Sequence, residues 1–192
     1  MSEGPCEAVV IGVSAGAVDA LSMLLPSLPA NYSRPVLVVV HLPPDKKSIM
    51  VELFRSMCAV LVREAEDKEP LAAGTVYFAP PDYHVLVERD RRLSLSSEEP
   101  VHFSRPAIDV TFESAAESFG PALVGVILTG ASSDGALGLK AVVAAGGRAI
   151  VQDPATAVMS AMPRAALDAC PGAAVLSLAA IAVHLHELGG PR

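Results

Sequence analysis

Short apolar segments alternate with longer mixed segments along most of this chain. A short apolar run rich in Val and Ile predicts a strand buried on both faces of a sheet. Such strands are expected at Ala8–Val13, Pro35–His41, Leu123–Leu128, Arg148–Val151 and Ala174–Leu176. Helices are expected at Gly16–Leu25, Asp45–Met57, Ile108–Phe119, Ser133–Ala145, Pro163–Ala169 (with proline at its first position) and Leu178–Leu188. Buried strands separated by helices predict an α/β fold, with a doubly wound, mostly parallel sheet in a Rossmann-like three-layer sandwich.

The middle of the chain departs from this alternation. Thr75–Ala79, His84–Glu88 and Leu93–Ser96 are short β-type segments that lie close together. Asp90-Arg91 lies between the last two, and this spacing predicts a small antiparallel hairpin. No internal repeat or linker interrupts the pattern, so residues 1–192 are expected to form a single domain with a core at about 8–188.

Composition and charge exclude several classes of protein. The chain is 52% hydrophobic, which is typical of a packed globular protein, and its net charge of −7 argues against nucleic-acid binding. Three widely spaced cysteines, Cys6, Cys58 and Cys170, indicate buried thiols in a reducing compartment. The first residues do not have the pattern of a signal peptide, and no apolar run is long enough to span a bilayer. A cytoplasmic protein without membrane insertion is therefore expected.

Three of the expected strands run into residues that could share a catalytic task. The first ends at Ser14, the second at His41, and a later one leads to Asp134. In a parallel sheet such residues meet at the carboxyl edge. Histidine can deprotonate a serine hydroxyl, and a carboxylate can orient the imidazole and stabilise its cation. The helix that begins near Gly16 would direct N–H groups toward a developing oxyanion.

Each of these residues also has a simpler interpretation. Ser14 could be a helix N-cap, His41 a loop histidine, and Asp134 a cap on the helix that begins near Gly135. The Gly-x-Ser-x-Gly string alone is a weak signal, because short motifs recur by chance. Only the joint pattern favours catalysis.

Two other folds carry related motifs in the first loop. A dinucleotide-binding fold needs a glycine where Ser14 stands and an acidic residue after the second strand, where this chain has His41. An α/β-hydrolase carries its triad in the order Ser, Asp, His, with several strands before the nucleophile. Neither pattern agrees with this sequence.

The chain resembles the catalytic domain of the chemotaxis protein-glutamate methylesterase (CheB) family from about Ala8 to Leu188. The resemblance rests on the order and spacing of several motifs together. They are Ile11–Gly16 (IGVSAG), Val40–Pro43 (VHLP), Arg63–Asp67 (REAED), Gly74–Pro80 (GTVYFAP), His84, Arg105–Phe112 (RPAIDVTF), Leu128–Gly135 (LTGASSDG), Gln152-Asp153 and Met162-Pro163.

The resemblance implies a Ser-His-Asp triad of Ser14, His41 and Asp134. It also implies hydrolysis of glutamyl methyl esters on chemoreceptor cytoplasmic helices, with release of methanol, and in many relatives deamidation of receptor glutamines. No metal or organic cofactor is implied. The backbone N–H groups of Ala15 and Ala131 are candidates for the oxyanion hole, and His84 and Arg105 are candidates for the substrate groove. Arg105-Pro106 could equally be no more than the start of a helix, with Asp109 in its first turn.

The sequence departs from the family pattern in three ways. The family usually has a hydroxyl residue and then two glycines after the nucleophile, whereas this chain has Ala15, Gly16 and Ala17. The family loop usually reads LTGMGxDG, whereas Ala131, Ser132 and Ser133 precede Asp134 here. A serine resists the positive φ that a glycine adopts, so Ser132 is expected to alter the loop. The receiver domain common in the family is also not expected in this chain, which would then be a stand-alone esterase or a fragment of a larger protein. A separate regulatory or receiver protein is a candidate partner. A non-catalytic scaffold or sensor with the same fold is the alternative hypothesis.

Overall fold

A seven-stranded parallel sheet forms the centre of the molecule. The computed structural model describes residues 6–41 and 49–189. The strands follow the order β3-β4-β2-β1-β7-β8-β9, and every neighbouring pair is parallel. Their bounds are β1 Ala8–Val13, β2 Val36–Val40, β3 Leu61–Glu64, β4 Thr75–Phe78, β7 Leu123–Ile127, β8 Arg148–Gln152 and β9 Ala174–Leu176. The remaining two strands, β5 (His84–Val87) and β6 (Leu93–Ser96), form a separate antiparallel hairpin.

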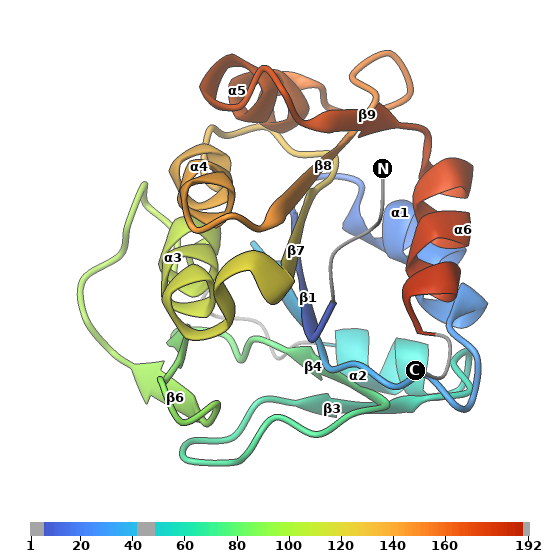
Figure 1. The fold of residues 1–192 in the computed structure, drawn as a ribbon, viewed down its shortest axis with the longest axis vertical. Coiled ribbons are helices and arrows are strands. Elements are labelled where there is room, and N and C mark those ends of the chain that lie inside the picture. Colours follow the sequence, from blue (N-terminus) through green and yellow to red (C-terminus); the bar gives the residue numbers. More distant parts are fainter. Residues whose placement is uncertain (1–5, 42–48, 190–192) are drawn as a thin grey trace.

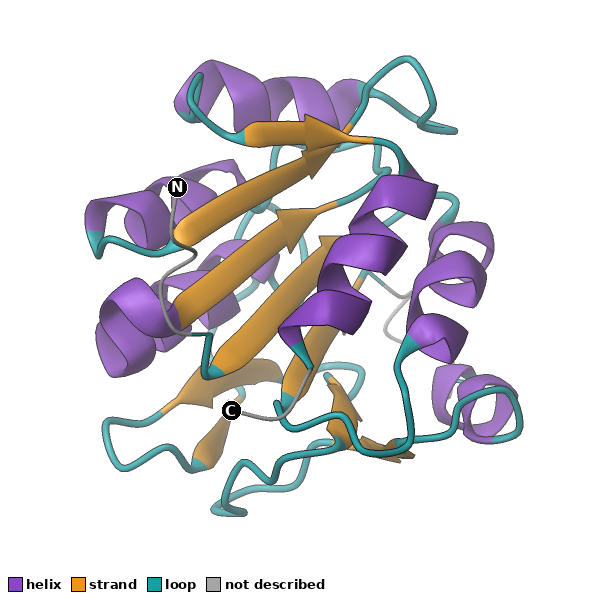
Figure 2. Cartoon of the chain, turned by 45° about the vertical axis from the view of Figure 1, so that its right-hand side comes forward, coloured by secondary structure: helices purple, strands orange, loops and turns teal. Residues whose placement is uncertain are grey.

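Helices cover both faces of the sheet (Figures 1 and 2). Their bounds are α1 Ala17–Leu24, α2 Met50–Arg55, α3 Ile108–Phe119, α4 Ala136–Ala144, α5 Ala161–Ala169 and α6 Leu178–Leu188, with short 3₁₀ turns at Leu25–Ser27 and Gly120–Ala122. Side chains from α1, α2 and α6 share one apolar core with the sheet, and those from α3, α4 and α5 share another. The doubly wound α/β fold and the hairpin predicted from the sequence are confirmed.

A glycine allows two neighbouring helices, α3 and α4, to approach closely. The helices α3 and α4 pack side by side, and a Cβ placed on Gly138 would lie only 2.6 Å from Phe112 Cβ. Such a contact is shorter than van der Waals packing allows, so glycine is needed where α4 crosses α3. The N-termini of the two helices meet near this crossing, where Asp109 of α3 accepts the Gly138 N–H of α4.

The structure corrects three local predictions. The strand β3 was not predicted, because its residues LVRE lie at an edge and alternate in burial, without a continuous apolar run. The helix α4 begins at Ala136, after a loop that includes Ser133. The helix α5 begins at Ala161, so Pro163 is its third residue; a proline is tolerated there because N–H groups of the first turn have no intrahelical partner. Part of the helix expected over Asp45–Met57 lies outside the described residues.

The central strand β1 marks the point where the chain reverses its direction of winding. It pairs with β2 on one side and with β7 on the other. Helices that leave the carboxyl ends of such neighbouring strands turn to opposite faces, which opens a crevice above the sheet. Ser14 follows β1, His41 follows β2, and Asp134 lies in the loop after β7.

Candidate active site

The strand register brings Ser14 and His41 to the same level of the sheet. Val13 pairs with Val40, and the His41 N–H donates to the Val13 carbonyl at 3.2 Å. Each candidate residue is therefore the next residue after a paired position on adjacent parallel strands, which lie about 4.8 Å apart. Both side chains line one open pocket of about 350 Å³. Within the described residues no hydrogen bond joins Ser14 Oγ to His41; catalytic hydrogen bonds of this kind commonly tighten only when substrate binds.

The turn that carries Ser14 is fixed from both sides. The Ser14 N–H donates to the Thr129 carbonyl at 2.9 Å, and the Thr129 hydroxyl donates to the Ala15 carbonyl at 2.8 Å. Gly16 has a φ of 85°, which side chains other than glycine rarely adopt. Gly12 is needed for a different reason, since a Cβ there would lie 2.5 Å from Ile108 Cγ2. Ser14 is thus held rigidly at the mouth of the crevice.

His41 is oriented by a direct bond to Asp134. Its Nε2 lies 2.7 Å from Asp134 Oδ2, and the carboxylate is fully buried. When Nε2–H donates to the carboxylate, Nδ1 of the neutral ring keeps a free lone pair and can act as a base. The chymotrypsin-type triad uses the two ring nitrogens the other way round. The arrangement here can accept a proton at Nδ1 from a nucleophile in the shared pocket.

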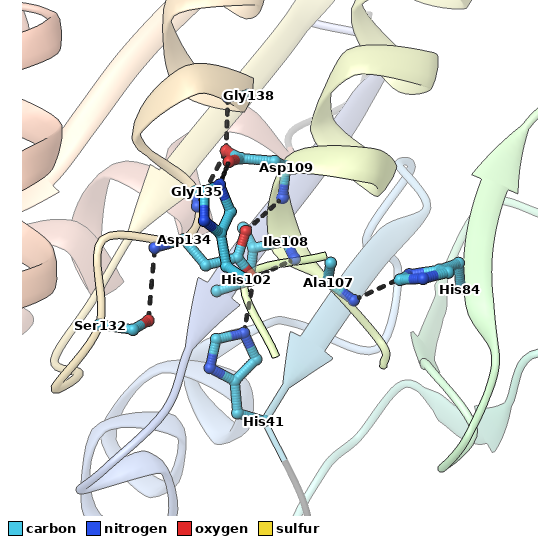
Figure 3. A network of polar contacts seen from close by, with 10 residues as sticks. All are labelled: His41, His84, His102, Ala107, Ile108, Asp109, Ser132, Asp134, Gly135 and Gly138. Atoms are coloured by element: carbon cyan, nitrogen blue, oxygen red, sulfur yellow. Dashed lines mark hydrogen bonds and ion pairs between the residues drawn. The ribbon is translucent and has the colours of Figure 1, made fainter. Parts of the chain in front are cut away.

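Asp134 also caps a helix, although not the one expected from the sequence. Its Oδ2 accepts the Ile108 N–H at 2.7 Å and its Oδ1 accepts the Asp109 N–H at 2.9 Å, so it caps α3 (Figure 3). Asp109 in turn caps α4, because its Oδ1 accepts the N–H groups of Gly135 and Gly138. The hypothesis that Asp134 caps the helix beginning near Gly135 is wrong. Each helix is thus capped by a carboxylate that belongs to the other helix or to the loop before it. Together with the bond to His41, the two bonds to α3 hold the Asp134 carboxylate in place.

The two buried carboxylates differ in their acidity. Burial acts to raise the pKa of Asp134, but the hydrogen bonds from His41 and from the Asp109 and Ile108 N–H groups outweigh burial and lower that pKa below its usual value. Burial raises the pKa of Asp109, the nearby Asp134 charge adds to this effect, and the Gly138 and Gly135 N–H groups oppose it. Asp134 is therefore kept ionised, as the partner of an imidazolium must be.

The expected oxyanion groups have free N–H donors. Neither Ala15 nor Ala131 donates its backbone N–H to an acceptor in the described parts of the chain, and both residues are exposed. The Ser132 backbone does not adopt a positive φ, so the expected strain from replacing glycine is absent there. Its hydroxyl instead accepts the Asp134 N–H at 3.3 Å. The altered loop is therefore compatible with the position of Asp134.

The two groove candidates lie in different surroundings. His84 is only 2% exposed; its Nδ1 accepts the Ala107 N–H and its Nε2 bonds the Glu99 carbonyl. The Nδ1 of His84 thus faces the start of α3 and its Nε2 faces the Glu99 carbonyl, and a role of His84 in the substrate groove stays a prediction. Arg105 lines a second pocket, of about 270 Å³, together with His41. Its guanidinium is bound to Asp82 and to the carbonyls of the 97–98 segment, and it does not start a helix, because α3 begins at Ile108.

Several features of the site could not be seen in the sequence. Asp109 was identified only as a first-turn residue, because the donors it accepts lie more than twenty residues away. Gln152, whose motif carries no assigned role, accepts the Thr129 N–H at 2.9 Å and so supports the Ser14 turn. Its position at the end of a predicted buried strand was the available signal.

The described residues contain neither a cluster of metal-binding side chains nor a membrane-spanning helix. In residues 6–41 and 49–189, no group of three or more His, Cys, Asp or Glu side chains could hold a metal ion. Over the same residues, no helix combines the length and apolar character needed to cross a membrane. Cys6 and Cys170 are buried free thiols, whereas Cys58 is only partly buried, contrary to the expectation that all three would be buried.

Comparison with known proteins agrees with this geometry. The family model for CheB methylesterase matches residues 9–185. The chain is 48% identical to a Leptospira interrogans protein over 176 residues, covering 92% of this chain and 91% of that protein. It is 42% identical over 178 residues to a Symbiobacterium thermophilum protein-glutamate methylesterase/protein-glutamine glutaminase, covering 93% of this chain and 49% of that protein.

The fold has a solved counterpart. The crystal structure of the Thermotoga maritima CheB methylesterase catalytic domain superposes with a TM-score of 0.90 at 34% identity, covering 96% of this chain and 100% of that one. The chain therefore belongs to the CheB methylesterase family and has the fold of its catalytic domain.

Proposed function

We propose that this chain hydrolyses glutamyl methyl esters of a protein, with Ser14 as nucleophile, His41 as general base and Asp134 as the orienting carboxylate. The family is one of carboxylic ester hydrolases, and the relatives described above include one named for both methylesterase and glutaminase activity. The observation that carries the assignment of residues is the 2.7 Å bond from His41 Nε2 to Asp134 Oδ2, beside a pocket that Ser14 and His41 share.

The first half of the reaction forms an acyl-enzyme. Ser14 Oγ attacks the ester carbonyl as His41 Nδ1 takes its proton, and the buried Asp134 charge stabilises the imidazolium. The backbone N–H groups of Ala15 and Ala131 donate to the oxyanion of the tetrahedral intermediate. The intermediate collapses, the C–O bond to the methoxy group breaks, and His41 returns its proton to the departing oxygen, which leaves as methanol.

The second half regenerates the enzyme. Water enters, His41 removes one proton from it, and the resulting hydroxide attacks the acyl carbonyl. The bond to Ser14 Oγ then breaks, His41 protonates that oxygen, and a free glutamate side chain is released. A glutamine side chain in the same position would release ammonia instead of methanol, so the same groups can support deamidation.

We further propose that the protein substrate is the cytoplasmic helical region of a chemoreceptor and that the enzyme works in the cytoplasm. A separate regulatory or receiver protein would control it. Membership of the CheB methylesterase family supports this assignment, and the pocket that Ser14 and His41 share is open to solvent, as a site for a side chain of another protein needs to be.

A direct experiment combines probe labelling with product release. A fluorophosphonate probe should modify wild-type protein at Ser14, and methanol should be released from a methylated receptor cytoplasmic fragment. The Ser14→Ala variant should lose both reactions and keep its fold, because the substitution removes a hydroxyl and at most a cap worth about 1 kcal/mol. If a folded wild-type sample neither reacted with the probe nor released methanol, the protein would be a non-catalytic scaffold.

A further inference from the structure

A tight turn next to the active site presents one aromatic side chain entirely to solvent. Val101 and Ser104 exchange backbone hydrogen bonds at 3.1 and 2.9 Å, which closes a two-residue turn over His102 and Phe103. Phe103 at its tip has an exposed fraction of 104%, the largest among the exposed apolar side chains of the described residues. Isolated exposed apolar residues are common on protein surfaces, so exposure alone does not indicate a binding site.

The backbone conformation of this turn is energetically unfavourable. His102 has a φ of 49° and Phe103 a φ of 61°, both in the left-handed region. Turns of this type normally carry Asn-Gly or similar residues, since a bulky side chain disfavours a positive φ. Strain of this kind costs on the order of 1–3 kcal/mol per residue and concentrates at functional sites. The Phe103 side chain recovers none of this cost through burial.

The turn lies next to the hydrogen-bond network of the catalytic carboxylate. His102 Nε2 lies 3.5 Å from Asp109 Oδ2, and the Asp109 N–H donates to Asp134 (Figure 3). The His102 side chain thus points toward the capping network, while the Phe103 side chain points into solvent. Phe103 also borders the pocket that Arg105 shares with His41. Its aromatic ring therefore stands at the edge of a pocket that the catalytic histidine also lines.

Other exposed apolar side chains border the nucleophile. Val18, 41% exposed, lines the same pocket as Ser14. Val158, 66% exposed, packs against the Ser14 turn, because a Cβ on Gly16 would lie 3.0 Å from Val158 Cβ. We refer to Val18, Phe103 and Val158 as the apolar rim. Val18 lines the Ser14 pocket, Phe103 lines the second pocket, and His41 belongs to both.

We propose that Phe103 is a specificity-determining anchor that binds an amphipathic helix of the protein substrate next to the esterified glutamate. This inference rests on the proposed function. A helix that directs one side chain toward Ser14 presents the side chains one turn before and after on the same face. Those neighbours would meet Phe103, which shares a pocket with His41, and the two valines that lie near Ser14. Apolar neighbours would bury the Phe103 ring, which nothing in the described chain covers.

The anchor should affect protein substrates and spare small ones. Phe103→Ala should lower kcat/KM for methanol release from a methylated receptor fragment about tenfold, chiefly through KM, as truncation of an aromatic interface anchor commonly does. Hydrolysis of p-nitrophenyl acetate, which is too small to reach the turn, should stay within about twofold. Phe103→Tyr should resemble wild type. Val183→Ala is the matched control, because Val183 is exposed on α6 and lines neither pocket.

A binding measurement separates this inference from the proposed function. In a Ser14→Ala background, fluorescence anisotropy with the labelled receptor fragment reports docking without turnover. Phe103→Ala should weaken the Kd about tenfold and Val183→Ala should leave it unchanged. Unchanged binding, or an equal loss on the receptor fragment and the small ester, would overturn the role of Phe103. Failure of wild type to release methanol while binding still depends on Phe103 would overturn the esterase assignment alone.

Discussion

Replacing Asp134 by asparagine should impair both activity and stability, because this carboxylate performs two tasks. Its Oδ2 accepts hydrogen bonds from His41 Nε2 and the Ile108 N–H, and its Oδ1 accepts one from the Asp109 N–H. Asparagine has a single oxygen. Its amide NH₂ must face the Ile108 and His41 side or the Asp109 side, where N–H donors already point.

The loss of activity should be large. With the amide NH₂ toward His41, the imidazole is driven to the tautomer that carries its proton on Nδ1 and cannot act as a base. With the opposite orientation the tautomer is kept, but the charge that stabilises the imidazolium is gone. The corresponding change in a well-studied triad lowers kcat on the order of 10⁴-fold. This is a loss of roughly 5 kcal/mol of transition-state stabilisation.

The loss of stability should be measurable as well. A buried N–H without an acceptor costs about 1–3 kcal/mol. At about 2–4 °C per kcal/mol for a chain of this size, the Tm should fall by about 2–12 °C. Methanol release and thermal unfolding measured on one sample test both effects. Asp168→Asn, on the exposed surface of α5, serves as the control and should change neither.

Two outcomes would refute this reasoning. A near-wild-type kcat with a lowered Tm would leave Asp134 as a cap of α3 and nothing more, and another carboxylate would have to orient His41. An unchanged Tm with a reduced kcat would mean that the capping bonds to α3 contribute nothing to the folded state.

Three further predictions test the packing and the buried groups. Gly12→Ala should destabilise the protein by about 1–3 kcal/mol in urea unfolding, because the new Cβ would lie 2.5 Å from Ile108 Cγ2; an unchanged midpoint would show that this contact can relax. Burial raises the pKa of the Cys58 thiol to about 11. Iodoacetamide should therefore alkylate Cys58 slowly at pH 8, and the rate should increase as the pH is raised toward that pKa. Rapid alkylation at pH 8 would contradict the raised pKa. Because the pKa of Asp109 is raised in the folded state, ionising this group costs stability. The unfolding free energy of wild type, measured relative to that of Asp109→Asn, should therefore rise as the pH falls from neutral through the raised pKa toward the unfolded value of about 3.9. A difference between the two proteins that does not change with pH would argue against the raised pKa.

Much of the fold could be predicted because its signals are local. The strands β1, β2 and β7 are continuous apolar runs, and burial of all their residues confirms the reason for that pattern. An edge strand gives no such signal: β3 carries charged residues and was missed. The candidate residues Ser14 and His41 could be placed together from the sequence, because parallel strands must end at the same edge of the sheet.

The sequence by itself therefore determined the α/β alternation, the carboxyl edge at which chemistry could occur and the three residue types gathered there. Only the tertiary structure decided which helix Asp134 caps, that His84 is buried against the start of α3, and that Phe103 stands exposed beside His41. The physical reason is range. Hydrophobic periodicity acts within a few residues, whereas the capping bonds of Asp134 and Asp109 join backbone and carboxylate groups that lie 25 to 29 residues apart. Such partners are chosen by the packing of α3 against α4, which no local pattern encodes.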